Sequence, residues 1–158
     1  MAYTILVVDD DELVRSSLDV ALRMEGYQVS TADGGRAALE ALERSSADLV
    51  VLDLSMPDLD GWETIARMRK TPRMANLPVV ALSGDYLDAQ RVRQAGFNAY
   101  VSKGSSLDQF LCTIQTAIEL AAGSRGIWLH SCNGQRCLTA PLSPADSAIP
   151  SPKSPLGS

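Results

Sequence analysis

The sequence predicts a doubly wound α/β domain, in which a parallel β-sheet carries helices on both faces. Short apolar or β-branched runs alternate five times with longer segments whose apolar residues have helical spacing. Several short runs end abruptly in polar residues, and several longer segments begin at a capping residue or end at glycine. Apolar strands that alternate with amphipathic helices are typical of a covered parallel sheet. Right-handed crossovers then give the doubly wound arrangement.

The strand candidates are short and mostly apolar. The first, YTILVV, ends at Asp9 and Asp10, and the third is an apolar run that stops at Asp53. A continuous apolar run of this kind is typical of a strand buried on both faces. We expect strands at residues 3–8, 27–31, 48–52, 78–82 and 98–102.

The helix candidates combine apolar spacing with residues that start or stop a helix. Asp60 with Glu63, and Ser106 with Gln109, have the spacing of a capping box. Gly96 is placed to end a helix. We expect helices at residues 13–24 and 35–44, from 60 through 68, and at 85–95 and 106–120.

Composition excludes several function classes. The chain has 158 residues, 46% of them hydrophobic, and a net charge of −5. This length suits one globular domain with a tail, and an acidic surface argues against direct binding to nucleic acid. No apolar stretch is long enough to span a membrane. The N-terminus, MAYTILVVDDDE, lacks the basic flank and cleavage site of a signal peptide, so we expect a cytoplasmic protein.

The composition changes near residue 122. We therefore expect a domain at residues 1–122 and a disordered, proline- and serine-rich tail at residues 123–158. One part of the tail leaves an alternative open, because Asn133-Gly134 is a hairpin turn signal that predicts a weak hairpin at residues 127–139. Five of the eight prolines lie in this tail: Pro141, Pro144, Pro150, Pro152 and Pro155.

Polar side chains follow four of the predicted strands. Asp9 and Asp10 follow the first strand, Asp53 the third, Ser83 the fourth and Lys103 the fifth. The carboxyl ends of parallel strands meet at one edge of the sheet, which is where ligands bind in this architecture. We therefore expect three carboxylates, a hydroxyl and an ammonium in one small cleft.

These residue types favour a magnesium and phosphate site. Three carboxylates a few ångströms apart repel one another unless a cation lies between them, and oxygen ligands suit Mg²⁺. Lys103 supplies a point charge for phosphate, and Ser83 supplies a hydroxyl donor. Asp53 is the candidate nucleophile because the third strand is central in a sheet of order 2-1-3-4-5.

Four motifs in order resemble the response-regulator receiver domain of two-component signalling. They are VVDD ending at Asp10, DLSMPDLDG starting at Asp53, ALSG containing Ser83 and YVSKG containing Lys103. The resemblance covers residues 3 to about 122 and implies a flavodoxin-like fold with five flanking helices.

The resemblance implies a role for each matching residue. Asp53 matches the phosphoacceptor, and family members take the phosphoryl group from a phosphohistidine on a kinase or phosphotransfer protein. Tyr100 matches an aromatic ring that turns inward when the switch hydroxyl engages phosphate. The other matches are the metal ligands Asp9, Asp10 and the backbone carbonyl of Ser55, the switch hydroxyl Ser83 and the phosphate-binding Lys103.

The expected function is a phosphorylatable receiver that uses Mg²⁺ and catalyses only its own phosphorylation and dephosphorylation. Its output would be contact with a downstream protein or onward transfer in a phosphorelay. One departure from the family is Gly104, which replaces the usual cis-proline after Lys103. We expect a trans peptide there, because a cis bond without proline costs about 2.5–4 kcal/mol, and a more pliable loop.

Alternatives remain at the level of residues and of the whole chain. Asp10, Asp11 and Asp60 could simply cap helices, Ser83 could belong to a turn, and Lys103 could be a solvated surface residue. The chain could be a receiver-like interaction module that is never phosphorylated. A dehalogenase-like phosphatase needs a second aspartate two residues after the nucleophile, where Ser55 stands.

Overall fold

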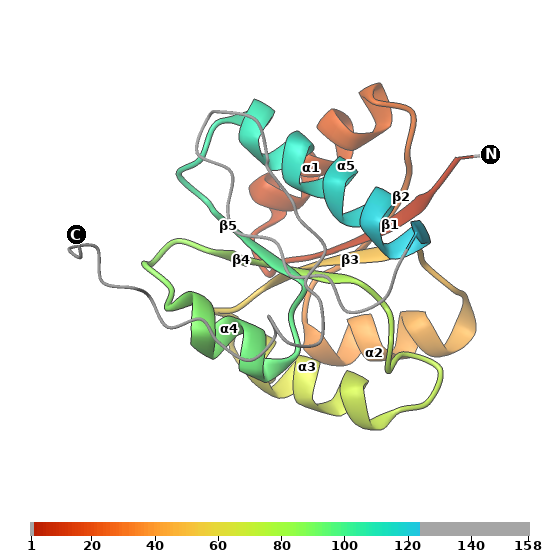
Figure 1. Cartoon of the computed structure of the whole chain (residues 1–158), viewed down its shortest axis with the longest axis vertical. Coiled ribbons are helices and arrows are strands. Elements are labelled where there is room, and N and C mark those ends of the chain that lie inside the picture. The colour runs from red at the N-terminus through yellow and green to blue at the C-terminus, as the bar shows by residue number, and fades with distance from the viewer. Residues whose placement is uncertain (1, 124–158) are drawn as a thin grey trace, which may run out of the picture.

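The computed structural model describes residues 2–123. Five parallel strands form one sheet in the order β2-β1-β3-β4-β5, which confirms the predicted topology (Figure 1). The strands are β1 (Thr4–Val8), β2 (Gln28–Ala32), β3 (Leu49–Asp53), β4 (Val79–Ser83) and β5 (Ala99–Ser102).

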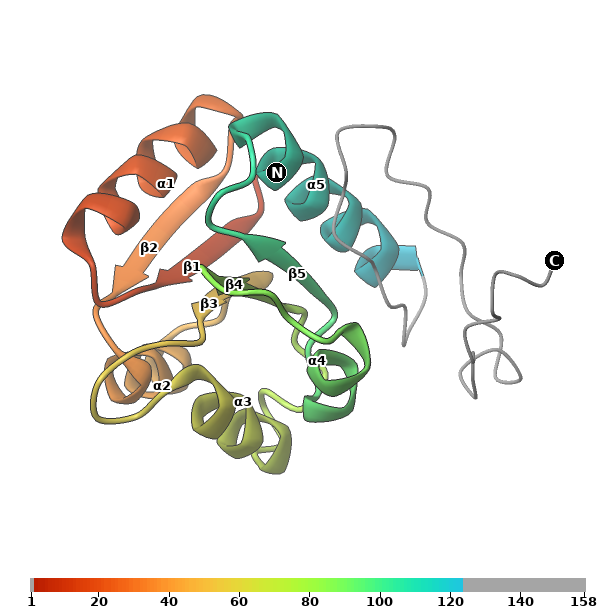
Figure 2. The same ribbon diagram turned by 90° about the vertical axis from the view of Figure 1, so that its left-hand side faces the viewer.

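Helices cover both faces of the sheet, as the alternating pattern predicts. Helices α1 and α5 lie together on one face, and α2, α3 and α4 lie on the other (Figures 1 and 2). The bounds are α1 (Glu12–Met24), α2 (Gly35–Arg44), α3 (Gly61–Lys70), α4 (Ala89–Ala95) and α5 (Leu107–Gly123).

The central strand β3 contributes to two hydrophobic cores. Val50 and Leu52 pack with the side chains of α2, α3 and α4, whereas Leu49 and Val51 pack with those of α1 and α5. All five residues of β3 are buried, which explains its uninterrupted apolar sequence. Each fully buried Val or Leu side chain contributes about 1.5–3 kcal/mol, so the position of the last residue of β3 is firmly set.

The ends of β3 and β4 lie one residue further along the chain than predicted. Asp53 and Ser83 are therefore the final residues of their strands and not the residues that follow them. Asp53 stands opposite Leu82, and Ser83 stands opposite Ser102 of β5. The sheet register itself thus holds both polar residues at the same edge.

The prediction of a helix from residue 85 is wrong at its start, because α4 begins at Ala89. The backbone N–H of Asp85 donates to Ser83 Oγ at 3.0 Å, which holds the chain in a turn. The side chain of Asp88 accepts from the N–H of Gln90 and caps the helix instead.

The capping predictions are confirmed. The Asp60 side chain accepts from the N–H of Glu63 at 2.9 Å. Ser106 and Gln109 form a reciprocal capping box, each side chain accepting from the other's backbone N–H at 3.2 Å. Gly96 ends α4 in the left-handed conformation, with φ of 109°.

The loop after β5 contains no cis peptide bond, and neither does the rest of residues 2–123. The expected trans bond between Lys103 and Gly104 is therefore confirmed. The N–H of Gly104 donates to Ser102 Oγ at 3.1 Å. Proline has no N–H, so the usual family residue at this position could not donate this hydrogen bond.

The predicted tail and its alternative hairpin at residues 127–139 lie outside the described residues. Among the helices of residues 2–123, none is both long enough and apolar enough to cross a membrane.

Candidate functional site

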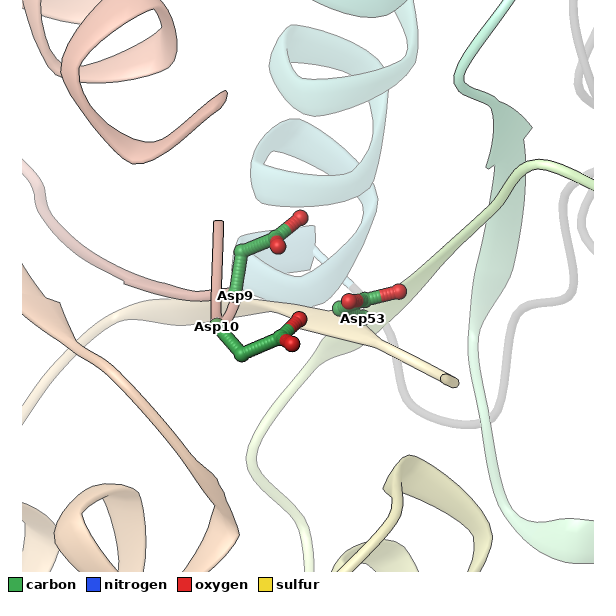
Figure 3. A group of neighbouring side chains, drawn as sticks. All are labelled: Asp9, Asp10 and Asp53. Carbon is green, nitrogen blue, oxygen red and sulfur yellow. The ribbon is translucent and has the colours of Figure 1, made fainter. Parts of the chain in front are cut away.

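Three carboxylates meet where β1 and β3 end. One oxygen each from Asp9, Asp10 and Asp53 lies within 4.8 Å of the other two (Figure 3). Asp9 and Asp53 are completely buried, whereas Asp10 is exposed. The predicted acidic cluster is therefore present, with two inner acids and one facing solvent.

Hydrogen bonds hold the backbone of Asp9 and one of its carboxylate oxygens. Its N–H donates to the carbonyl of Ala32 at the end of β2, at 3.2 Å. Its Oδ1 accepts from the N–H of Asp11 at 2.8 Å, and its carbonyl accepts from Arg15 Nη1 at 2.8 Å. The other carboxylate oxygen, Oδ2, faces Lys103.

Lys103 bridges the two buried acids. Its Nζ lies 3.1 Å from Asp9 Oδ2 and 3.3 Å from Asp53 Oδ1. The backbone places it, since the N–H of Lys103 donates to the carbonyl of Ser83 at 2.7 Å and so continues the pairing of β5 with β4. Lys103 is partly exposed, but its ammonium contacts both buried acids.

Burial dominates the electrostatics of Asp53. It raises the pKa of the Asp53 carboxyl, with help from the charge of Asp9, to about 6, although the N–H of Ser55 and the ammonium of Lys103 oppose the rise. Burial alone would lower the pKa of Lys103, but its bonds and charge interactions with Asp9 and Asp53 more than offset this, so its pKa is raised.

One carboxylate oxygen of Asp53 has no partner. Oδ1 accepts from the N–H of Ser55 at 3.2 Å and faces Lys103. Oδ2 is buried and accepts no hydrogen bond from the described residues. A buried, unsatisfied oxygen is costly to leave alone, so this atom is positioned for a cation or an electrophile.

The loop after β3 approaches the acid closely. A Cβ on Gly61 would lie 2.4 Å from the carbonyl oxygen of Asp53 and 2.7 Å from the Cα of Leu54. Only glycine fits at this position. The loop that carries Ser55 therefore returns tightly against the strand end that carries Asp53.

Ser83 ends β4 beside the strand of Asp53, and Tyr100 lies on the neighbouring strand β5. The buried hydroxyl of Ser83 is engaged by the backbone of Asp85. Tyr100, opposite Ala81 in the β4–β5 pair, is half-buried against the core on the α2–α4 face. Burial, followed by the charges of Tyr86 and Asp88, raises the pKa of its phenol.

A family model described as "Response regulator receiver domain" matches residues 5–115. The chain belongs to this family. The receiver is 38% identical over 120 residues to the response regulator MprA of Mycolicibacterium vanbaalenii, covering 75% of this chain and 51% of that protein. It is 42% identical over 101 residues to an uncharacterized 14.6 kDa protein of Leptolyngbya boryana, covering 63% of this chain and 77% of that protein.

Solved structures agree with the fold of this receiver. A putative response regulator from Chloroflexus aurantiacus has a TM-score of 0.71 at 27% identity, covering 76% of this chain and all of that one. The chemotaxis protein CheY4 of Vibrio cholerae has a TM-score of 0.70 at 24% identity, covering 74% and 99% respectively, and supports the fold alone. The receiver spans about half the length of MprA and of KdpE, a transcriptional regulatory protein of Mycobacterium tuberculosis that it also matches.

One residue of the receiver's site was not found from the sequence. Arg15 contacts the carbonyl of Asp9 from the second turn of α1. Its only signal in the sequence is an arginine shortly after three consecutive aspartates, and many exposed helix faces carry such a residue.

Proposed function

We propose that this receiver accepts a phosphoryl group from a phosphohistidine onto Asp53, with Mg²⁺, and that the acyl phosphate changes its contacts with protein partners. The observation that carries the proposal is the buried, unpartnered Oδ2 of Asp53, on a carboxylate whose other oxygen, Oδ1, lies 3.3 Å from the Lys103 ammonium. An ionised carboxylate held this way is a nucleophile whose attacking atom is already free of hydrogen bonds.

The donor set fits Mg²⁺. Asp10, Asp53 and the backbone carbonyl of Ser55 would be direct ligands, with Asp9 completing the acidic site. These are all oxygen donors, which this hard cation prefers. Bound Mg²⁺ would offset the negative charge of the carboxylates and of the phosphoryl oxygens.

The transfer step is a displacement at phosphorus. An Asp53 carboxylate oxygen forms a bond to phosphorus while the phosphorus–nitrogen bond to the donor imidazole breaks. The imidazole nitrogen keeps the electron pair and takes up a proton. Lys103 stabilises charge on the phosphoryl oxygens, and the Ser83 hydroxyl would exchange its contact with Asp85 for a phosphoryl oxygen.

The partners follow from this chemistry. A sensor histidine kinase or a histidine phosphotransfer protein would donate the phosphoryl group, and a downstream protein would read the result. Exchange of the Ser83 contact would alter the turn before α4, beside Tyr100, and bias an existing equilibrium of that surface.

The test is the intact mass of the full chain after incubation with acetyl phosphate and Mg²⁺. We expect one added phosphoryl group on wild type and on Asp58→Asn, a control that removes an exposed acid of the neighbouring loop. Asp53→Asn, or omission of Mg²⁺ with a chelator present, should give none. Equal addition on Asp53→Asn and wild type would refute the assignment. No addition on wild type, with partner binding indifferent to Asp53→Asn, would favour the unphosphorylated module.

A further inference from the structure

The exposed carboxylate of Asp10 points into the site. One of its oxygens lies within 4.8 Å of a carboxylate oxygen of Asp9 and of Asp53, and Figure 3 shows the side chain pointing toward Asp53. Within residues 2–123 the structure shows no hydrogen bond or ion pair that holds this carboxylate in place. Something other than side-chain contacts must therefore aim it into the site.

Both peptide planes that meet at the Cα of Asp10 are fixed by hydrogen bonds. The plane before it contains the carbonyl of Asp9, which accepts from Arg15 Nη1 at 2.8 Å. The plane after it contains the N–H of Asp11, which donates to Asp9 Oδ1 at 2.8 Å. Because peptide groups are planar, the two bonds together set the direction in which the Asp10 side chain leaves the chain.

Arg15 is itself anchored to this turn. Its backbone N–H donates to the carbonyl of Asp11 at 3.0 Å, while the Asp11 side chain caps α1 by accepting from Leu13 at 2.9 Å. The guanidinium thus reaches back from the start of α1 to the main chain between β1 and that helix. Its side chain is partly buried along this path.

We propose that Arg15 is a positioning residue for the divalent ion: by holding the carbonyl of Asp9, it aims the Asp10 carboxylate. This inference rests on the proposed function, since it concerns the same ion. The charge of Arg15 alone predicts the opposite effect on metal affinity. A cationic side chain beside a cation site repels the ion. If Arg15 did not position Asp10, removing Arg15 would therefore tighten Mg²⁺ binding.

The experiment compares Arg15→Met with Arg67→Met in the full chain, by calorimetric titration with Mg²⁺. Arg67→Met removes the same charge and side chain from an exposed face of α3. Loss of an outer contact that orients a metal ligand weakens metal affinity about 10-fold to 100-fold. We expect Arg15→Met to raise the Kd for Mg²⁺ at least about 10-fold, with Arg67→Met within about twofold of wild type. An unchanged or lower Kd for Arg15→Met would overturn the inference.

A double-mutant cycle separates positioning from a general effect on folding. If Arg15 acts through Asp10, Arg15→Met should change the Kd by less than about twofold when Asp10 is already Asn. The same loss in both backgrounds would overturn the inference. Arg15→Lys keeps a donor and should recover part or all of the affinity, so a Kd for Arg15→Lys as weak as that of Arg15→Met would overturn the inference. If Arg15→Met does not fold, Arg15→Gln takes its place in the same comparisons. If wild type binds no Mg²⁺, the proposed function fails as well, whereas normal binding by both wild type and Arg15→Met overturns only the role of Arg15.

Discussion

The ammonium of Lys103 lies 3.3 Å from Oδ1 of the fully buried Asp53. The same nitrogen lies 3.1 Å from Oδ2 of Asp9, so one ammonium group contacts two buried carboxylates. In the absence of a metal ion, this bridge and the N–H groups of Ser55 and Asp11 compensate for placing two carboxylates inside the protein. The stability of the receiver should therefore depend on the charge state and occupancy of its site.

Lys103→Met should destabilise the metal-free protein by about 1–3 kcal/mol, because two buried carboxylates lose their shared charged partner. Added Mg²⁺ should restore part of this loss. The measurement is urea unfolding with EDTA and then with Mg²⁺, and Lys70→Met, on the exposed end of α3, serves as the control. A stability of Lys103→Met equal to that of the control in EDTA would contradict the bridging role.

The metal-free receiver should lose stability as the pH rises between the ordinary aspartate pKa of 3.8 and about 6. In that window the folded state keeps a proton on Asp53 that the unfolded chain has released, so stability falls with rising pH. The contribution is on the order of 1–3 kcal/mol. Unfolding curves in EDTA at several pH values measure it.

Asp53→Asn should remove this pH dependence and make the metal-free protein more stable than wild type at neutral pH. The reason is that a neutral amide carries no desolvated charge at the buried strand end. Mg²⁺ should stabilise wild type more than the variant, because an ion stabilises a folded protein only to the extent that the folded protein binds it. A variant that keeps the wild-type slope between these pH values would show that another group titrates.

Gly61→Ala should destabilise the fold by about 1–3 kcal/mol through overpacking. The added methyl carbon would lie 2.4 Å from the Asp53 carbonyl oxygen, so the loop and the strand end must separate. Gly84→Ala is the matched control, because its Cβ would meet no atom within 4 Å. Thermal unfolding of the two variants gives the comparison, and equal melting temperatures would contradict the close approach.

Arg69→Met should be among the more damaging substitutions outside the site, at about 2–4 kcal/mol. Its guanidinium donates to the carbonyls of Gly96, Met74 and Ala75 and to the side chain of Asn98, at 2.8–3.2 Å. The partly buried carbonyls would lose their donor. The exposed Arg67→Met should change stability by less than about 0.5 kcal/mol, and urea unfolding distinguishes the two.

The fold was predictable because two sequence patterns both indicate a covered parallel sheet. The uninterrupted apolar run before Asp53 is buried on both faces, and each strand is followed by a helix with an apolar stripe. Asp9, Asp53 and Lys103 were predictable for a related reason: residues at the carboxyl ends of parallel strands must share one edge.

The start of α4 and the role of Arg15 could not be predicted from the sequence, because both depend on individual side-chain rotamers. Asp85 and Asp88 are both plausible helix caps, and only the bond from the N–H of Asp85 to Ser83 Oγ excludes the earlier start. Arg15 could have extended into solvent as readily as toward Asp9. The raised pKa of Asp53 likewise depends on its degree of burial, which no local pattern of residues reveals.

The contrast in exposure among the three acids has a kinetic consequence. Two carboxylates lie inside and Asp10 alone meets the solvent, so a hydrated ion can first touch the protein without any opening of the fold. It can exchange its waters for carboxylate oxygens one at a time. The rates at which the ion enters and leaves the site would then be limited by dehydration of the ion itself. Occupancy of the site would follow the surrounding ion concentration without delay.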